Sequence, residues 1–241
     1  MLTLRGGAAR RNVWAQISFA RLLLNFKQIP YRTEWISYPD IEPTMIALKA
    51  APTSQRADGS PFYTLPVIKD ADSIISDSYD IADYIDRKYP TAHAAAFPPR
   101  TRAAQACILS FLSRNLLPVL RPLVIPHIHP ILDPRGAAYM RLTREAQFGS
   151  TLEFILPLGT PEREAQWDKV ARELEMVGAW FEESEGDWLG GTEPFYADLV
   201  LAAHFLWIIK GRVPDGWERV RLWHEGRWER FMDQCEPYIH M

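Results

Sequence analysis

The chain has 241 residues, 47% of them hydrophobic, with 27 basic and 30 acidic side chains and a formal net charge of −3. This length allows one large domain or two small ones, and the apolar fraction excludes wholesale disorder. The charge argues against a general nucleic-acid binder, and no apolar run approaches the ~20 residues of a membrane helix. The two cysteines, Cys107 and Cys235, are far apart, which excludes a disulfide scaffold and a CxxC motif and fits a reducing compartment.

The first 33 residues contain several basic side chains and no acidic one. This composition is similar to that of a mitochondrial transit peptide. We favour the interpretation that the segment forms the first strand and helix of the fold, because residues 19–26 lead into the folded part without a cleavable spacer.

Residues 1–90 have the pattern of a mixed α/β domain in the order β-α-β-α-β-β-α. The expected elements are a strand near residues 3–4, a helix over 15–27, a strand over 31–36, a loop with helical turns over 39–60, a proline-interrupted hairpin over 62–75, and a helix that Ser78 caps.

A linker and an all-helical region are predicted after this domain. Residues 91–101 are mostly small and include two adjacent prolines, which is typical of a linker. Residues 102–241 show helical spacing and form the predicted second domain. The periodic segments are 102–117, 135–154, 161–183, 197–210 and 217–235.

The strongest candidate site combines residues 64–68 (Thr-Leu-Pro-Val-Ile) with Asp77 and Ser78. A proline inside a strand cannot donate to the sheet, and a cis bond there leaves neighbouring backbone groups free to pair with an extended peptide. The amides and hydroxyl at a helix start favour a carboxylate, while Asp77 can accept from an α-amino group. Together these features predict a site for the amino-acid end of a small peptide.

With these motifs, the chain resembles the cytosolic-type glutathione transferases, and in particular their fungal etherase-related class. The resemblance covers about residues 20–237. The stretches that carry it are residues 21–35, 38–43, 58–68, 75–78, 141–149, 196–198 and 226–232.

The resemblance implies a thioredoxin-like α/β amino-terminal domain, an all-α carboxy-terminal domain, and a cytoplasmic homodimer that uses glutathione and no metal. It also implies that the backbone of Leu65 and Val67, beside cis-Pro66, holds the cysteinyl part of glutathione. Asp77 and Ser78 would hold its γ-glutamyl end.

The catalytic segment departs from this family. The family's serine position falls on Trp14, followed by Ala15 and Gln16, and Ser18 is the one hydroxyl nearby. A thiol needs a hydrogen-bond donor or a helix amino terminus to become a thiolate at neutral pH. Ser18 is therefore the candidate catalytic residue, and a backbone amide, Arg10 or Arg11 are the alternatives.

A second departure lies at Phe195, where the family has a serine or threonine that caps a helix. Phe195 cannot cap through its side chain. Thr192 could do so if the helix began earlier, since Pro194 would suit its first turn, and Asp198 would then be a buried acid with different partners.

The acceptor cleft is expected to use Trp14, His127, Tyr139 and Arg144, with Tyr139 and Arg144 gripping an anionic or phenolic substrate. His127 and His129 alternate in a proline-rich segment that we expect to be extended and to line the cleft, a metal site being the alternative. His204 is expected to be a satisfied core histidine. Packing is the expected role of four tryptophans: Trp207, Trp217, Trp223 and Trp228.

The function expected from the resemblance is thiolate addition to, or ether cleavage of, a small aromatic electrophile. Two alternatives stay open because the catalytic segment is altered. One is an isomerase, lyase or cyclase of specialised metabolism on the same fold. The other is a non-catalytic ligand-binding dimer.

Overall fold

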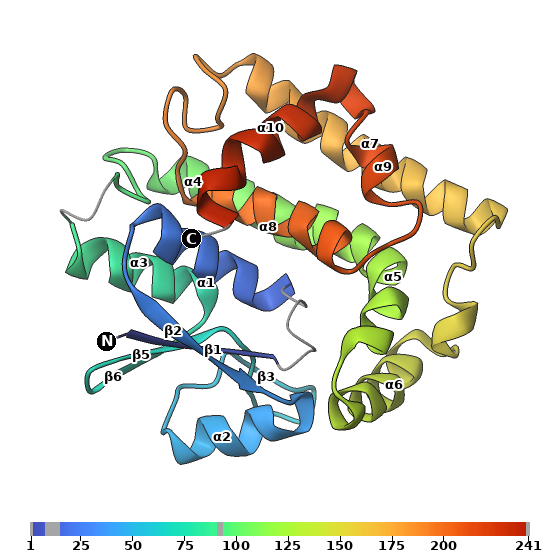
Figure 1. Ribbon diagram of the computed structural model, residues 1–241, viewed down its shortest axis with the longest axis horizontal. Coiled ribbons are helices and arrows are strands. Elements are labelled where there is room, and N and C mark those ends of the chain that lie inside the picture. Colours follow the sequence, from blue (N-terminus) through green and yellow to red (C-terminus); the bar gives the residue numbers. More distant parts are fainter. Residues whose placement is uncertain (1, 8–14, 91–93, 240–241) are drawn as a thin grey trace.

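The structure is a computed structural model and describes residues 2–7, 15–90 and 94–239. Its first part is a four-stranded mixed sheet with the order β2-β1-β5-β6. Helices α1 and α3 cover one face of this sheet, and α2 covers the other (Figure 1). The elements are β1 (Leu2–Gly7), α1 (Ala15–Phe26), β2 (Tyr31–Ile36), the 3-10 turn η1 (Tyr38–Asp40), α2 (Ile41–Ala47), β3 (Ser54–Gln55), β4 (Pro61–Phe62), β5 (Val67–Asp70), β6 (Ser73–Ser76) and α3 (Ser78–Lys88).

The amino-terminal segment supplies a central strand of this sheet. β1 pairs in parallel with β2 and antiparallel with β5, so that Leu4 lies opposite Thr33 on one side and Ile68 on the other. Leu4 and Ile68 are fully buried. The described part of this segment belongs to the fold, as expected. The predicted order of the first domain is observed except for two additional short strands, β3 and β4, which pair with each other between α2 and β5.

The second part consists of helices packed around α8, which is buried on nearly all sides. A helix that is apolar all round belongs in the middle of a domain. The elements are α4 (Arg102–Phe111), a π-helical turn (Leu112–Leu116), α5 (Leu117–Ile128), η3 (His129–Ile131), α6 (Pro134–Phe148), η4 (Leu152–Phe154), α7 (Pro161–Glu182), α8 (Tyr196–Lys210), α9 (Trp217–Val220) and α10 (Trp223–Ile239), with positive φ angles at residues 224–226 in α10.

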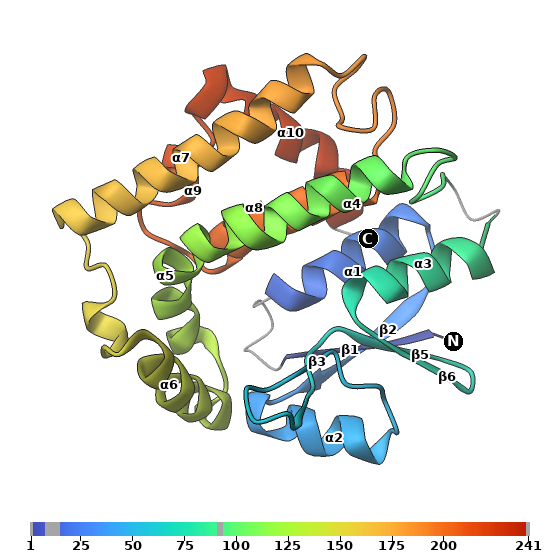
Figure 2. The same cartoon turned by 180° about the vertical axis from the view of Figure 1, so that it is seen from behind.

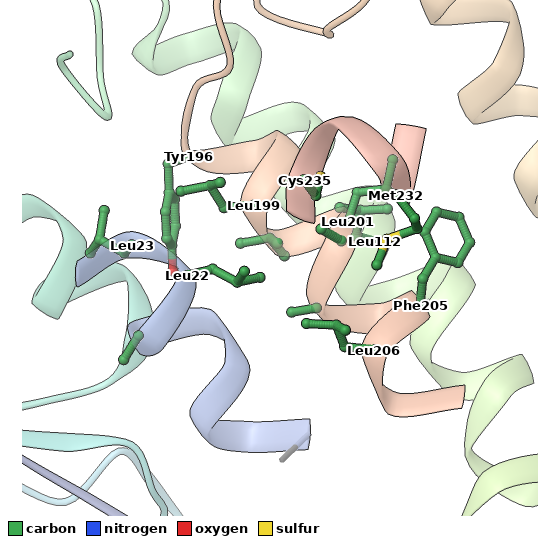
Figure 3. Close-up of a cluster of buried hydrophobic side chains, with 14 of the residues drawn as sticks. Leu22, Leu23, Leu112, Tyr196, Leu199, Leu201, Phe205, Leu206, Met232 and Cys235 are labelled. Carbon is green, nitrogen blue, oxygen red and sulfur yellow. The ribbon is translucent and has the colours of Figure 1, made fainter. Parts of the chain in front are cut away.

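The two parts share one apolar core. Helix α1 packs against α8 and α10 of the helical domain. Leu22 and Leu23 lie on the α1 side of this contact, and Tyr196, Leu199 and Cys235 lie on the helical side (Figure 3). Because α1 touches the sheet on one side and α8 on the other, it buries apolar residues around most of its circumference.

The helical stretch from α4 through α5 corrects the expectation that no apolar run approaches the length of a membrane helix. Residues 102–131 are long and apolar enough to cross a membrane by length and composition. A core helix passes the same test, and this stretch buries Leu112, Leu116 and Leu123 in the helical domain. We therefore assign it to the core.

The proline-rich segment is helical, so the expectation of an extended chain is wrong. Pro118, Pro122 and Pro126 recur every four residues, which places the missing N–H donors on one face of α5. The remaining residues of α5 keep the helical backbone conformation. His127 and His129 are two residues apart, and such residues do not face each other on a helix.

The start of α8 is organised by Asp198 rather than by a capping hydroxyl. Its buried carboxylate accepts the N–H of Phe195 at 3.0 Å, of Leu189 at 2.8 Å and of Gly190 at 3.3 Å. The carbonyl of Phe195 accepts the N–H of Asp198 at 3.1 Å. The helix begins at Tyr196, so the alternative of an earlier start capped by Thr192 is wrong.

A buried ion pair attaches the segment that follows α3. The Lys27 ammonium donates to the Asp86 carboxylate and to the carbonyl of Ala94, both at 3.0 Å. The same carboxylate accepts the N–H groups of Ala96 at 2.8 Å and Phe97 at 3.1 Å. These contacts connect α1, α3 and the start of the helical part.

Candidate functional site

The backbone around Pro66 has hydrogen-bonding groups that no described residue uses. The Leu65–Pro66 peptide bond is cis. Val67 pairs with Arg5 and with Ser76 in the sheet, whereas Leu65, which is buried, makes no backbone hydrogen bond to the described residues. Because buried backbone groups are almost always paired, the free N–H and C=O of Leu65 are suited to an extended ligand.

Asp77 and Ser78 form the exposed start of α3. Asp77 has a φ of 72°, which non-glycine residues rarely adopt, and its carboxylate accepts the N–H of Tyr79 at 2.8 Å. This bond is the capping contact, and it engages Oδ1 only. The Ser78 hydroxyl has no hydrogen-bond partner among the described residues. The helix start thus offers a carboxylate oxygen, a hydroxyl and unpaired amides to a zwitterionic ligand.

A cavity of about 470 Å³ lies between the sheet and the helical domain. Helices α5 and α6 stand beside the sheet domain on the side of α2 and β3 (Figure 2). Thr64, directly before Leu65, lines the cavity, so the free backbone at Leu65 adjoins this space. The other lining residues are Phe19, Tyr38, Phe62, Leu117, Arg121, Ile125, Ile128, Met140, Arg144, Gln147, Ala203, His204 and Trp207.

Contacts between η1 and α6 close one side of the cavity. The Ser37 hydroxyl donates to the Asp133 carboxylate at 2.9 Å, and the rings of Tyr38 and Tyr139 stack with their centroids 6.4 Å apart. Asp40 and Arg135 form a bidentate pair with both bonds at 2.7 Å. These contacts join the sheet domain to the helical domain at this side of the cavity.

Positive charge gathers on the helical side of the cavity. Burial lowers the pKa of the Arg121 guanidinium, and the like charge of Arg144 acts in the same direction. Burial also raises the pKa of the Tyr38 hydroxyl, and Arg144 opposes that shift. Tyr38 is therefore neutral at physiological pH.

His204 adds a neutral imidazole to the cavity wall. Its Nδ1 lies 2.7 Å from the carbonyl of Val200 on its own helix, which makes Nδ1 the protonated nitrogen. Burial lowers the pKa of His204 to about 4. The buried Nε2 has no partner among the described residues, so His204 is a core histidine with only one nitrogen satisfied.

The structure brings some of the expected cleft residues together and separates others. Arg144 lines the cavity, and Tyr139 stacks at its rim. His127 instead lines a separate pocket on the other side of α5 with His129, Glu153 and Arg163. In the described part of the chain, no group of three or more His, Cys, Asp or Glu side chains could hold a metal ion.

The expected catalytic segment falls mostly outside the described residues. Trp14, Arg10 and Arg11 are not among them. Ser18 belongs to α1, but its side chain is also outside the described part.

Sequence reasoning missed several cavity residues. Tyr38 and Phe62 lie in short turns and strands without periodicity, and Arg121 was hidden in the proline-rich run. Trp207, expected only to pack, is half-buried and forms part of the cavity wall. The one available signal was the spacing of the α5 residues, since positions 117, 121, 125 and 128 share a helix face.

The fold is that of the glutathione transferases. It combines a thioredoxin-like domain, which contains a cis-proline, with a helical domain. Residues 19–88 match the glutathione S-transferase N-terminal domain model, and residues 103–238 match the corresponding C-terminal domain model. The chain belongs to the glutathione S-transferase family.

Its relatives include fungal proteins. The chain is 31% identical over 204 residues to the glutathione S-transferase-like protein ustS of Aspergillus flavus, covering 78% of this chain and 71% of that protein. It resembles the crystal structure of CsGST63524 of Ceriporiopsis subvermispora in complex with glutathione, with a TM-score of 0.94, 31% identity, and coverage of 100% and 98% of the two chains. GSTFuA3 from Phanerochaete chrysosporium matches with a TM-score of 0.91, 32% identity, and coverage of 100% and 98%.

Proposed function

We propose that the chain is a glutathione transferase that joins the thiolate of glutathione to a small aromatic electrophile or uses it to cleave an aryl ether. A sulfur–carbon bond forms as the bond from that carbon to its leaving group breaks. The electron pair departs with the halide or phenolate, and the thiol proton goes to solvent. Holding both reactants side by side supplies much of the rate enhancement.

The observation that carries this proposal is the position of Leu65. Its free backbone groups are next to Thr64, which lines the cavity between the two domains. A cysteinyl residue held by the backbone of Leu65 beside Pro66 would direct its sulfur toward that cavity; Val67, expected to share this role, already pairs with Arg5 and Ser76 in the sheet. Asp77 and Ser78 would bind the γ-glutamyl end.

Thiol activation is assigned to groups near the start of α1. Ser18 stays the candidate side chain. A backbone amide at the helix amino terminus, Arg10 and Arg11 are the alternatives. The division into residues 1–90, 91–101 and 102–241, a homodimeric state and a cytoplasmic location belong to the same proposal.

A second candidate function follows from the altered catalytic segment. Trp14 occupies the position of the family's serine. The chain would then use the same fold as an isomerase, lyase or cyclase of specialised metabolism, or as a ligand-binding dimer without catalysis.

Calorimetric titration with glutathione tests the binding site. We expect measurable affinity in the wild type and about tenfold weaker binding in Ser78→Ala, because a hydrogen bond to a carboxylate is lost. Ser113→Ala is the matched control, since this exposed hydroxyl bonds only the carbonyl of Ser110. No heat in the wild type, or equal affinity in both variants, contradicts the site.

A conjugation assay with 1-chloro-2,4-dinitrobenzene separates the two candidate functions. Turnover supports the transferase, whereas glutathione binding without turnover supports the second candidate. If Ser18→Ala leaves the thiolate absorbance of bound glutathione unchanged, Ser18 is not the activating group.

A further inference from the structure

Two arginines that line the cavity have no acidic partner in the described part of the chain. Arg121 on α5 and Arg144 on α6 are half-buried, and neither has an acidic partner among the described residues. Arg121 donates to the Gln147 side chain at 3.2 Å, and Arg144 donates only a long contact of 3.4 Å to Thr143. By contrast, the nearby Arg141 pairs with two glutamates. Two adjacent unpaired guanidinium groups favour an anion between them.

The walls of the same cavity are aromatic. Tyr38, Phe62 and Trp207 come from three separate elements and all border this space. Apolar aliphatic side chains from α5, α6 and α8 also border this space. Such surroundings favour a flat aromatic body over a fully hydrated anion such as phosphate.

We propose that the acceptor is a small aromatic electrophile with a carboxylate, which Arg121 and Arg144 bind. This inference rests on the proposed transferase function for its reaction. The ligand class itself follows from the cavity alone, so the two can be tested separately.

The carboxylate is tested with two acceptors of nearly equal shape, 4-chloro-3,5-dinitrobenzoate and its neutral amide. In Arg121→Gln and Arg144→Gln, we expect the KM for the acid to rise about tenfold and the KM for the amide to change less than twofold. Arg114→Gln is the control, because Arg114 is exposed on the same helical stretch and does not line this cavity. The KM for glutathione should stay unchanged in all three variants.

Two outcomes overturn the carboxylate assignment. One is an equal change for acid and amide. The other is a change that falls on the KM for glutathione, which would mean that the arginines hold the carboxylate of the tripeptide.

Calorimetry with unreactive 3,5-dinitrobenzoate separates this inference from the proposed function. If neither acceptor is turned over but this acid binds the wild type about tenfold more tightly than Arg121→Gln, the ligand class holds and the transferase function fails. If the acid does not bind, the inference is wrong whatever the turnover.

Discussion

His204 is a buried residue whose titration makes the stability of the fold depend on pH. Burial lowers the pKa of its imidazole from an ordinary 6.5 to about 4. Between these two values the unfolded chain binds a proton that the folded chain does not. The free energy of unfolding therefore has its full value, with respect to this residue, above pH 6.5, and it decreases as the pH falls toward 4.

We expect the free energy of unfolding of the wild type to decrease between pH 7 and pH 4, with a His204 share of at most about 3 kcal/mol. Urea unfolding of wild type and His204→Phe at several pH values measures this share, because phenylalanine cannot take up the proton. The expected result is a shallower decrease in the variant. Parallel curves for the two proteins would show that His204 does not carry the effect.

At the scale of a single element, the start of α8 depends on an internal carboxylate. Burial raises the pKa of Asp198 to about 7, and the amides of Phe195, Leu189 and Gly190 oppose this shift. A capping serine would satisfy one or two amides of the helix itself. Asp198 also holds the loop before the helix, and it thereby substitutes for the missing cap at Phe195.

Replacing Asp198 with alanine is expected to destabilise the protein by roughly 3 kcal/mol or more, since three amides lose their acceptor. Asp198→Asn keeps one acceptor oxygen and should cost less. Chemical unfolding at neutral pH compares the two variants with the wild type. A loss below about 1 kcal/mol in Asp198→Ala would mean that water replaces the carboxylate at little cost.

The sequence predicted those parts of the molecule that depend on local chemistry. The interrupted hairpin at Pro66, the helix start at Ser78 and the helical second half follow from turn residues and periodicity. The cavity does not follow from turn residues or periodicity, because its lining residues come together only when the two domains pack. Arg121 was obscured since proline normally breaks helices, and the free Nε2 of His204 depends on neighbours from other elements.

At the scale of the whole molecule, two kinds of contact fix the domains around the cavity. The apolar contact of α1 with α8 forms one side, and the polar contacts between η1 and α6 form the other. The buried Lys27–Asp86 pair holds the connecting segment against the first domain. Burial alone would raise the pKa of Asp86. Hydrogen bonds from the Ala96 and Phe97 amides and from Lys27 outweigh this effect and lower the pKa below its ordinary value.

We expect Asp86→Ala to lower the free energy of unfolding by roughly 3 kcal/mol, because Lys27 and two amides lose their partner inside the protein. Breaking the exposed Asp40–Arg135 pair with Arg135→Ala should change stability little. Because the pKa of Asp86 is lowered in the folded state, its contribution is present above the unfolded pKa of 3.8 and disappears on further acidification. Urea unfolding at pH 7 and pH 3 measures both effects, and equal losses for the two variants would contradict the assignment.

The origin of the cavity wall has a consequence for redesign. The cationic side comes from α5 and α6, whereas the free backbone beside Pro66 comes from the sheet domain. If the proposed function holds, a combinatorial library restricted to positions 117, 121, 125, 144 and 147 would therefore alter which electrophiles are accepted and leave the proposed glutathione site unchanged. Under the same proposal, the members of such a library would share glutathione as the nucleophile and differ in the electrophile that they select.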